Sequence, residues 1–280
     1  MLYEQALRTA DRKSAVIRSV PDLMAALELR GMLDLHIDGA LGGVPTLSLR
    51  PGQTLRAATE GAGLQFLPGC EGVRLSRDNA LLGLSLRADP ALRVVFNDEL
   101  APDLGRLYLS GLRVSGQVQV LARGAVRAGH VEVDGLDIEA ADTRARGDRP
   151  RGVGVEVLQG AFTLWNQHSD ATTVLSARLK GLSAGRAGAP VIGSGILVCG
   201  SGIDGGRVVA TLVETGAVYS QGMIETGATE RIRGGVFTSL GATVALVHNP
   251  GSVLTYGAND IVFDNWGAVH DWTGDVPVAC

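Results

Sequence analysis

A motif of alternating apolar residues followed by a glycine recurs along the chain at a nearly constant spacing. Residues 107–114 read Leu-Tyr-Leu-Ser-Gly-Leu-Arg-Val, and residues 131–138 read Val-Glu-Val-Asp-Gly-Leu-Asp-Ile. Further copies begin at Val155 and, more loosely, at Ala177. The glycines of the four copies are separated by 24, 25 and 21 residues. A period of 20–25 residues with strands and no helix in each unit is typical of successive coils of a parallel β-helix.

Short strands account for most of the chain after residue 31. Apolar and polar residues alternate over Leu33–Gly39, Val73–Leu75 and Leu82–Leu86, and Gly, Pro, Asn or Asp interrupt such stretches. This alternation is the pattern of half-buried strands. Glycine makes up 39 of the 280 residues, about twice its usual share of about 7%, as a fold with many tight turns requires.

These patterns together predict an all-β fold. We expect a right-handed parallel β-helix over residues 31–280, with an exposed loop near 141–152 that is rich in arginine. Gly216, Gly235 and Gly257 extend the glycine spacing at steps of 19 and 22 residues. An antiparallel sandwich of short strands is the alternative, although it does not require a constant spacing.

The first thirty residues follow a different pattern. Apolar residues recur there at helical spacings, namely Leu2, Ala6, Leu7, Leu23, Met24 and Leu27. Proline is tolerated in a first helical turn, so Pro21 marks the start of a second helical stretch. The pattern predicts a short helical cap over residues 1–30, which would cover the open apolar end of the solenoid.

Four stretches near the N-terminus follow an order of turns and strands found in a known superfamily. They are Ser19–Leu27, His36–Gly39, Leu47–Leu55 and Gly72–Leu75. In this order a short helix precedes a strand ending in glycine, and a Pro-Gly precedes a Thr-Leu strand. The segment resembles the opening of the pectate-lyase-like right-handed β-helix superfamily over about a quarter of the chain.

The resemblance implies a function in carbohydrate chemistry. Enzymes of this superfamily act on polysaccharides through acidic residues on the outward faces of adjacent coils, with calcium and an arginine base in the lyases. The sequence contains no Gly-His-Gly and no Arg-Ile-Lys, so the resemblance supports the fold more than an activity. Calcium enters only through this resemblance, and no cofactor is predicted from the residues themselves.

Polar residues are densest in the C-terminal third. His248 and Asn249 follow the strand 244–247, and Asp264 and Asn265 follow the strand 261–263. If these strands stack in neighbouring coils, His248 and Asp264 would lie about 5 Å apart. The candidate catalytic residues are His248, Asp264, His270 and Asp271, and the candidate ligand-binding residues are Asn249, Asn265 and Trp266. The alternative is that Asn and Asp cap turns through local backbone hydrogen bonds.

A second polar group follows the strand 161–164. Trp165, Asn166 and His168 are candidate ligand-binding residues, since an indole with amide and imidazole groups can hold a sugar. Equally, they can form one exposed loop. The nearby segment 142–151 contains four arginines and a proline, so it is a surface loop that either attracts an acidic polymer, acts as a lid or is simply solvated.

Metal sites and disulfides have little support. Asp34, His36 and Asp38 alternate on one face of a strand, but such a row is more often solvated than metal-binding. The three cysteines are widely spaced and form no CxxC pattern, which indicates neither a disulfide framework nor a zinc site. We predict no metal ligands.

Charge and hydropathy restrict the partners. The net charge of −4 argues against nucleic acid, which calls for a basic surface. No apolar stretch reaches the 18 residues of a membrane span, and the N-terminus lacks the features of a secretory signal. We therefore expect a cytoplasmic protein with a saccharide or small-molecule ligand.

Three functions fit the sequence. The first is binding, lysis or hydrolysis of an acidic saccharide. The second is a non-catalytic interaction module that self-associates as a homo-oligomer through an uncovered last coil. The third is an intracellular isomerase or cyclase that uses the groove of the solenoid, with 142–151 as its lid.

Overall fold

A computed structural model describes residues 13–152, 154–223, 230–257 and 260–274. Most of them belong to two sheets whose strands pair in parallel, apart from one short antiparallel pair. The only helix among the described residues is α2 (Val20–Glu28). The prediction of an all-β fold is therefore confirmed.

The two sheets contain most of the described chain. The 15-stranded sheet comprises β1 (Lys13–Ile17), β2 (Met32–Ile37), β3 (Ala40–Val44), β5 (Thr54–Ala57), β6 (Gly63–Phe66), β8 (Ala80–Leu82), β9 (Ser85–Arg87), β11 (Asp103–Ser115), β13 (Ala128–Ala140), β17 (Val174–Ala184), β18 (Val191–Ile192), β20 (Arg207–Gln221), β22 (Ala242–Asn249), β23 (Val253–Tyr256) and β25 (Ala268–Gly274). The 10-stranded sheet comprises β4 (Leu47–Ser48), β7 (Val73–Leu75), β10 (Arg93–Asn97), β12 (Gln117–Ala122), β14 (Arg151–Gly152), β15 (Val155–Val157), β16 (Gly160–Asn166), β19 (Ser194–Cys199), β21 (Arg231–Thr238) and β24 (Asp260–Asn265).

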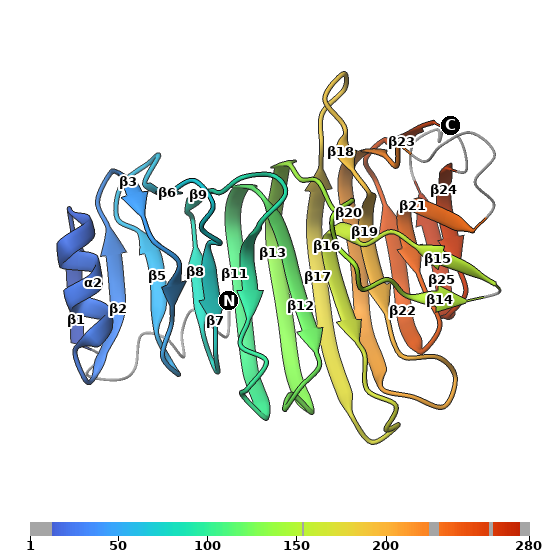
Figure 1. Cartoon of the computed structure of the whole chain (residues 1–280), viewed down its shortest axis with the longest axis horizontal. Helices are drawn as coiled ribbons and strands as arrows, with labels where there is room; N and C mark the ends of the chain where they lie inside the picture. The colour runs from blue at the N-terminus through green and yellow to red at the C-terminus, as the bar shows by residue number, and fades with distance from the viewer. Residues whose placement is uncertain (1–12, 153, 224–229, 258–259, 275–280) are drawn as a thin grey trace.

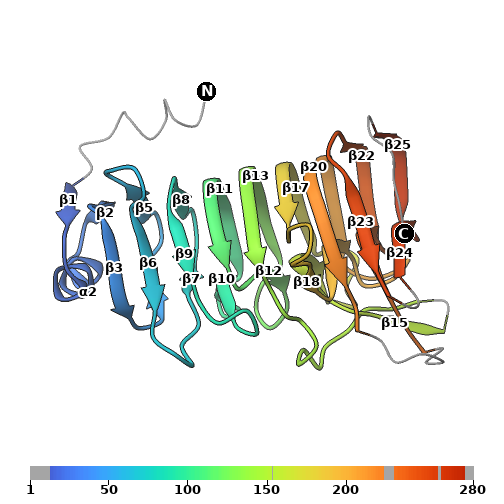
Figure 2. The same ribbon diagram turned by 90° about the horizontal axis from the view of Figure 1, so that it is seen from above.

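The chain passes alternately through the two sheets, and each passage through both is one circuit. Strands of one circuit pair in parallel with their counterparts in the next, as β11 does with β13 and β12 with β16. Successive circuits therefore lie side by side along the long axis, from blue to red in Figure 1 and again in Figure 2.

Aliphatic side chains form columns between the sheets because paired strands place equivalent residues on the same face. One column runs through Leu81, Leu109, Val133, Leu179 and Val213. All five are buried, and burial of each such side chain stabilises the fold by about 1.5–3 kcal/mol. The alternation seen in the sequence thus sets which side of each strand faces the core.

The recurring glycine marks a corner within the long strands. Gly111, Gly135 and Gly181 stack on one another, with φ values of +59°, +82° and +68° that favour glycine over other residues. The first, second and fourth copies of the motif are therefore structurally equivalent. The third copy was predicted wrongly: Gly160 lies in β16 of the other sheet and pairs with Ser194. Likewise, Gly235 lies in β21 of that sheet and is not equivalent to Gly216.

The N-terminal segment is only partly helical. Ser19 caps α2, and its side chain accepts a hydrogen bond from the backbone N–H of Asp22 at 3.2 Å. The helix buries Leu23 and Leu27 against the first strands, at one end of the molecule in Figure 1. Residues 13–17, predicted as part of the helical cap, form strand β1 instead, because they pair in parallel with β2 and bury Ile17. Residues 1–12 of the predicted cap lie outside the described residues.

Candidate functional site

Residues 141–152 and 154–159 connect β13 to β16 and pack against the outer face of β12, β16, β19 and β21; we call this segment the strap. Within it, β14 and β15 pair antiparallel, and β15 pairs in parallel with β21. In Figure 1 both strands extend beside the strands of the C-terminal third. The predicted exposed loop near 141–152 is therefore longer than expected and packed in part, since Thr143 and Gln159 are buried.

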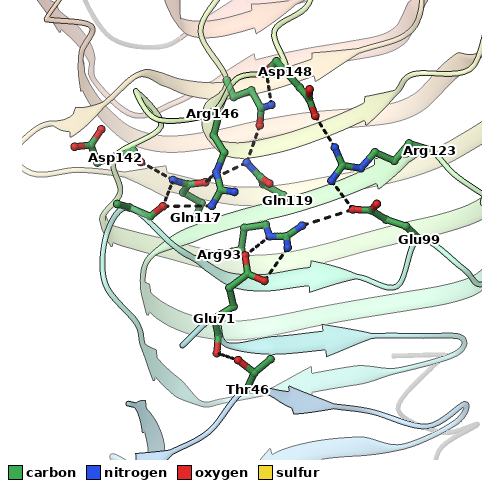
Figure 3. A network of polar contacts seen from close by, with 12 residues as sticks. Thr46, Glu71, Arg93, Glu99, Gln117, Gln119, Arg123, Asp142, Arg146 and Asp148 are labelled. Atoms are coloured by element: carbon green, nitrogen blue, oxygen red, sulfur yellow. Dashed lines mark hydrogen bonds and ion pairs between the residues drawn. The ribbon is translucent and has the colours of Figure 1, made fainter. Parts of the chain in front are cut away.

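Three buried glutamines hold the first half of the strap (Figure 3). Gln117 donates from Nε2 to the carbonyl oxygens of Asp142 and Ala91 at 2.5 and 3.0 Å. Gln119 donates to Gln159 Oε1 at 2.6 Å, and Gln159 donates to the carbonyl oxygen of Asp148 at 2.6 Å. Buried polar groups are costly unless they are hydrogen-bonded, so these contacts fix the position of the strap.

Ion pairs reinforce the same end of the strap (Figure 3). Arg123 bridges two carboxylates, with Nη2 at 2.6 Å from Glu99 Oε1 and Nη1 at 2.5 Å from Asp148 Oδ2. Arg93 holds Glu71 through two contacts of 2.5 and 2.7 Å. The Arg123–Asp148 pair links the strap to the end of β12, whereas the Arg93–Glu71 pair joins β10 to the residues before β7.

The second half of the strap covers an apolar cluster that is separate from the main core. Its buried members lie on β12, β15, β16, β19 and β21, and they are Leu121, Val157, Trp165, Leu197, Cys199 and Phe237. Trp266 packs against the cluster, edge-on to Phe237 with ring centroids 4.9 Å apart. Its ring also lies directly on Gly152 of β14, where an added Cβ would come within 2.8 Å of the ring. Two tryptophans predicted to bind ligand are thus brought to one face.

A cavity of about 330 Å³ opens at this end of the strap, and we call it the tryptophan pocket. Its lining includes Arg149, Arg151, Trp165, Gln167, Ser201 and Ser239. Trp165 is 9% exposed, and its indole N–H donates to the carbonyl oxygen of Gly200 at 3.2 Å. The pocket therefore combines a fixed aromatic ring with polar groups, a combination found in small-molecule sites.

Positive charge exceeds negative charge beside the tryptophan pocket. Arg149, Arg151 and Arg231 converge on one carboxylate, that of Glu156, with Nη1 of Arg149 at 3.3 Å and Nε of Arg231 at 3.8 Å from Oε2. Hydrogen bonds from Arg151 and then Arg149 lower the pKa of Glu156, so Glu156 stays ionised. Because three arginine side chains share one carboxylate, the edge of the tryptophan pocket can attract a further anion.

Two of the predicted ligand-binding asparagines are structural. Asn166 is fully buried, and its Nδ2 donates to the carbonyl oxygens of Thr173 and Arg207 at 3.0 and 3.1 Å. Asn249 is 2% exposed, donates to Thr215 Oγ1 at 2.6 Å and accepts a 2.7 Å hydrogen bond from the Trp272 indole. Neither carboxamide is exposed to a ligand, which agrees with the alternative that such residues stabilise turns.

His248 and Asp264 do not lie on stacked strands, so this part of the prediction is wrong. β22, which holds His248, pairs with β20 and β25, whereas β24, which holds Asp264, pairs with β21 in the other sheet. Nδ1 of His248 lies 2.9 Å from Thr273 Oγ1 instead. Similar sequence steps here lead to different sheets, because each circuit contributes to both.

The other candidate residues divide between the two sheets. His270 and Asp271 are exposed on β25, next to β22. Asp264 lies beside Trp266, and burial raises its pKa, although hydrogen bonds from the Asn265 backbone and Trp266 partly oppose this shift. Asn265 is exposed and accepts a 3.0 Å hydrogen bond from the N–H of Gly267. The ring of His168 lies 2.9 Å from Nη1 of Arg127, outside both sheets.

Another histidine lies on the outer face of the 15-stranded sheet. Nδ1 of His130 is 2.8 Å from Ser176 Oγ. Burial and the nearby Arg106 cation lower the pKa of His130.

The predicted row of Asp34, His36 and Asp38 is occupied by ion pairs. Asp34 accepts from Arg56 at 2.7 Å, and Asp38 from Arg18 at 2.9 Å. Over residues 13–152, 154–223, 230–257 and 260–274, no three His, Cys, Asp or Glu side chains are grouped as metal ligands. No helix in the same part of the chain is long and apolar enough to cross a membrane.

The residues that hold the strap were missed in the sequence. The signal was present in Gln117-Val-Gln119-Val, where two amides share one face of a strand. In the sequence, two amides on one side of a strand indicate a solvent-exposed side, and only the structure shows that another segment covers it.

Comparison with known proteins yields no match: no family model, no curated protein and no solved structure is similar to this chain.

Proposed function

We propose that the chain is a right-handed parallel β-helix of the pectate-lyase-like kind. The proposal is supported by parallel pairing between successive circuits, by aliphatic columns between the sheets and by a helix at the N-terminal end. In such a solenoid, insertions between strands project from one face and build binding sites there. The strap is an insertion of this kind.

We infer that the protein binds an acidic saccharide in the tryptophan pocket. The observation that carries this inference is the pocket's pairing of the Trp165 ring with Arg149 and Arg151, in a cluster where three arginines share one carboxylate. Guanidinium groups bind carboxylates through paired hydrogen bonds. An indole gives an apolar surface for a sugar ring, and Gln167, Ser201 and Ser239 supply polar contacts for its hydroxyl groups.

Binding rather than catalysis suits the composition of this pocket. Its lining contains no carboxylate and no imidazole, and general acid–base chemistry on a glycosidic bond needs such groups within hydrogen-bond reach. The cavity volume of about 330 Å³ is near the lower end of ordinary ligand sites. A short oligosaccharide with one carboxylate inside the pocket fits these limits.

Calorimetric titration with a uronate trisaccharide and with its neutral counterpart tests the proposal. The uronate should bind and the neutral sugar should bind at least tenfold more weakly, since a charge-assisted hydrogen bond contributes about 1.5–3 kcal/mol. Arg151→Gln removes the positive charge of a side chain that is 78% exposed. The fold should therefore persist while uronate affinity falls. Arg74→Gln is the matched control, because Arg74 lies on β7 of the same sheet and its guanidinium donates to Ser48 Oγ; this variant should bind as the wild type does.

Equal affinity for the two sugars, or an unchanged affinity in Arg151→Gln, would contradict the proposal. Absence of binding together with a multimer on size exclusion would favour the self-associating module instead.

A further inference from the structure

A second cavity is lined by residues 145–148 and Gln159 of the strap, and it shares no lining residue with the tryptophan pocket. Its volume is about 180 Å³, and we call it the arginine pocket. The lining is mostly polar, with Arg93, Gln119, Arg123, Arg146, Asp148 and Gln159 around it (Figure 3). Three guanidinium groups therefore line one small cavity between the strap and strands β10 and β12.

Two of these arginines are engaged by carboxylates. Arg93 is held by Glu71, and Arg123 is shared between Glu99 and Asp148. The Nε of Arg123 is nevertheless buried without a hydrogen-bond partner. A buried donor without an acceptor costs about 1–3 kcal/mol, so Arg123 is held beside the cavity at a cost in stability.

Arg146 is the third arginine, and its contacts are to neutral oxygen atoms. Its Nε donates to Gln117 Oε1 at 2.6 Å, and its Nη2 donates to the carbonyl oxygen of Ala91 at 3.3 Å. It forms no ion pair with a carboxylate in the described part of the chain. Burial, and then repulsion from Arg93, lowers the pKa of Arg146. The fold thus keeps a partly buried guanidinium beside other cations, a costly arrangement that an anion would relieve.

We propose that the arginine pocket binds a small tetrahedral oxyanion of the phosphate or sulfate type, with Arg146 and Arg123 of its lining as the cationic groups. A tetrahedral oxyanion presents acceptor atoms in every direction, as a small cavity lined by donors requires. The apolar surface of the lining comes mainly from Leu121 and Ala145, too little for the organic part of a larger ligand.

Asp148 competes with the oxyanion in this arrangement. Its carboxylate accepts from Nη1 of Arg123 at 2.5 Å, and its side chain is 59% exposed on the strap. It therefore neutralises part of the pocket while the anion is absent, and it repels an anion that enters. Removal of the Asp148 charge should strengthen anion binding, whereas removal of the Arg146 charge should weaken it.

Isothermal titration with inorganic phosphate tests the proposal, with sulfate as a second probe and chloride at matched ionic strength as the blank. The wild type should bind phosphate, Asp148→Asn should bind it about tenfold more tightly, and Arg146→Gln at least tenfold more weakly, each corresponding to about 1.4 kcal/mol. Comparison of free phosphate with a sugar phosphate then identifies whether the anion is free or carried by an ester. Arg151→Gln, in the tryptophan pocket, should leave phosphate binding unchanged, so this proposal and the saccharide proposal fail separately.

Circular dichroism of each variant without anion shows that it is folded, and Arg146→Lys supplies a second variant that keeps the charge but loses the forked donor. It should bind phosphate with intermediate affinity. The proposal is overturned if the wild type binds phosphate no better than chloride, or if Asp148→Asn weakens the binding.

Discussion

Substitution of Asn166 by alanine should lower stability without lowering saccharide affinity. The fully buried Asn166 side chain donates to the carbonyl oxygens of Thr173 and Arg207 at 3.0 and 3.1 Å and accepts from the N–H of His168 at 3.2 Å. Truncation removes these three hydrogen bonds, although the carbonyl oxygen of Thr173 keeps a 3.0 Å hydrogen bond from the N–H of Arg207. At about 1 kcal/mol each, the free energy of unfolding should fall by about 3 kcal/mol.

Urea denaturation measures this change, and a thermal scan should show a midpoint lower by about 5 °C for a chain of this size. Asn265→Ala is the matched control, because Asn265 is exposed and makes a single hydrogen bond to the N–H of Gly267 at 3.0 Å. It should cost less than about 1 kcal/mol. If Asn166→Ala kept full stability but lost uronate binding, Asn166 would be a ligand contact and the reasoning from its burial would be wrong.

Three further predictions follow from individual residues. Burial raises the pKa of the Cys199 thiol to about 12, so a thiol reagent at pH 8 should label the half-buried Cys70 but not Cys199, as peptide mass spectrometry would show; labelling of Cys199 before unfolding would contradict its burial. The pKa of His130 lies below its ordinary value near 6.5, so the unfolded chain binds a proton first and stability should fall as the pH drops below about 6.5; His130→Asn should flatten this pH dependence in urea melts, and an unaltered slope would refute it. A Cβ at Gly72 would lie 2.0 Å from the carbonyl oxygen of Val94, so Gly72→Ala should lower the urea midpoint strongly, and a wild-type midpoint would show that the backbone can move apart there.

Much of the fold could be predicted because it depends on local patterns. Alternating residues such as Leu107–Leu109 and Val131–Val133 can bury one side only as strands, and a glycine is needed where the backbone turns with positive φ at Gly111 and Gly135. The capping serine, Ser19, and the apolar spacing after it similarly define helix α2. These features depend only on residues that are close in sequence, so they can be predicted without knowing which segments pack against them.

Pairing across circuits could not be read in this way. Val133 pairs with Leu179, and the chain between them includes the strap. Leu109 pairs with Val133, and the chain between these two residues is much shorter. The strap lengthens the connection between β13 and β17 and so changes the spacing of the motif. For this reason Gly160 was predicted to be equivalent to Gly111 and Gly135, although it lies in the other sheet. The prediction that His248 and Asp264 are neighbours was wrong because similar sequence steps lead to different sheets, since each circuit contributes strands to both.

The sequence by itself therefore determined the strands, the corner glycines and the apolar side of each strand, since side-chain alternation and backbone conformation are local properties. Only the tertiary structure decided which strands became neighbours, because the lengths of the connections set the register between circuits. It also decided the site. The strap places Arg146 beside β12 and Arg149 beside Trp165. A charged loop of this kind forms cavities only where it packs against a second surface, and the sequence does not show which surface that is.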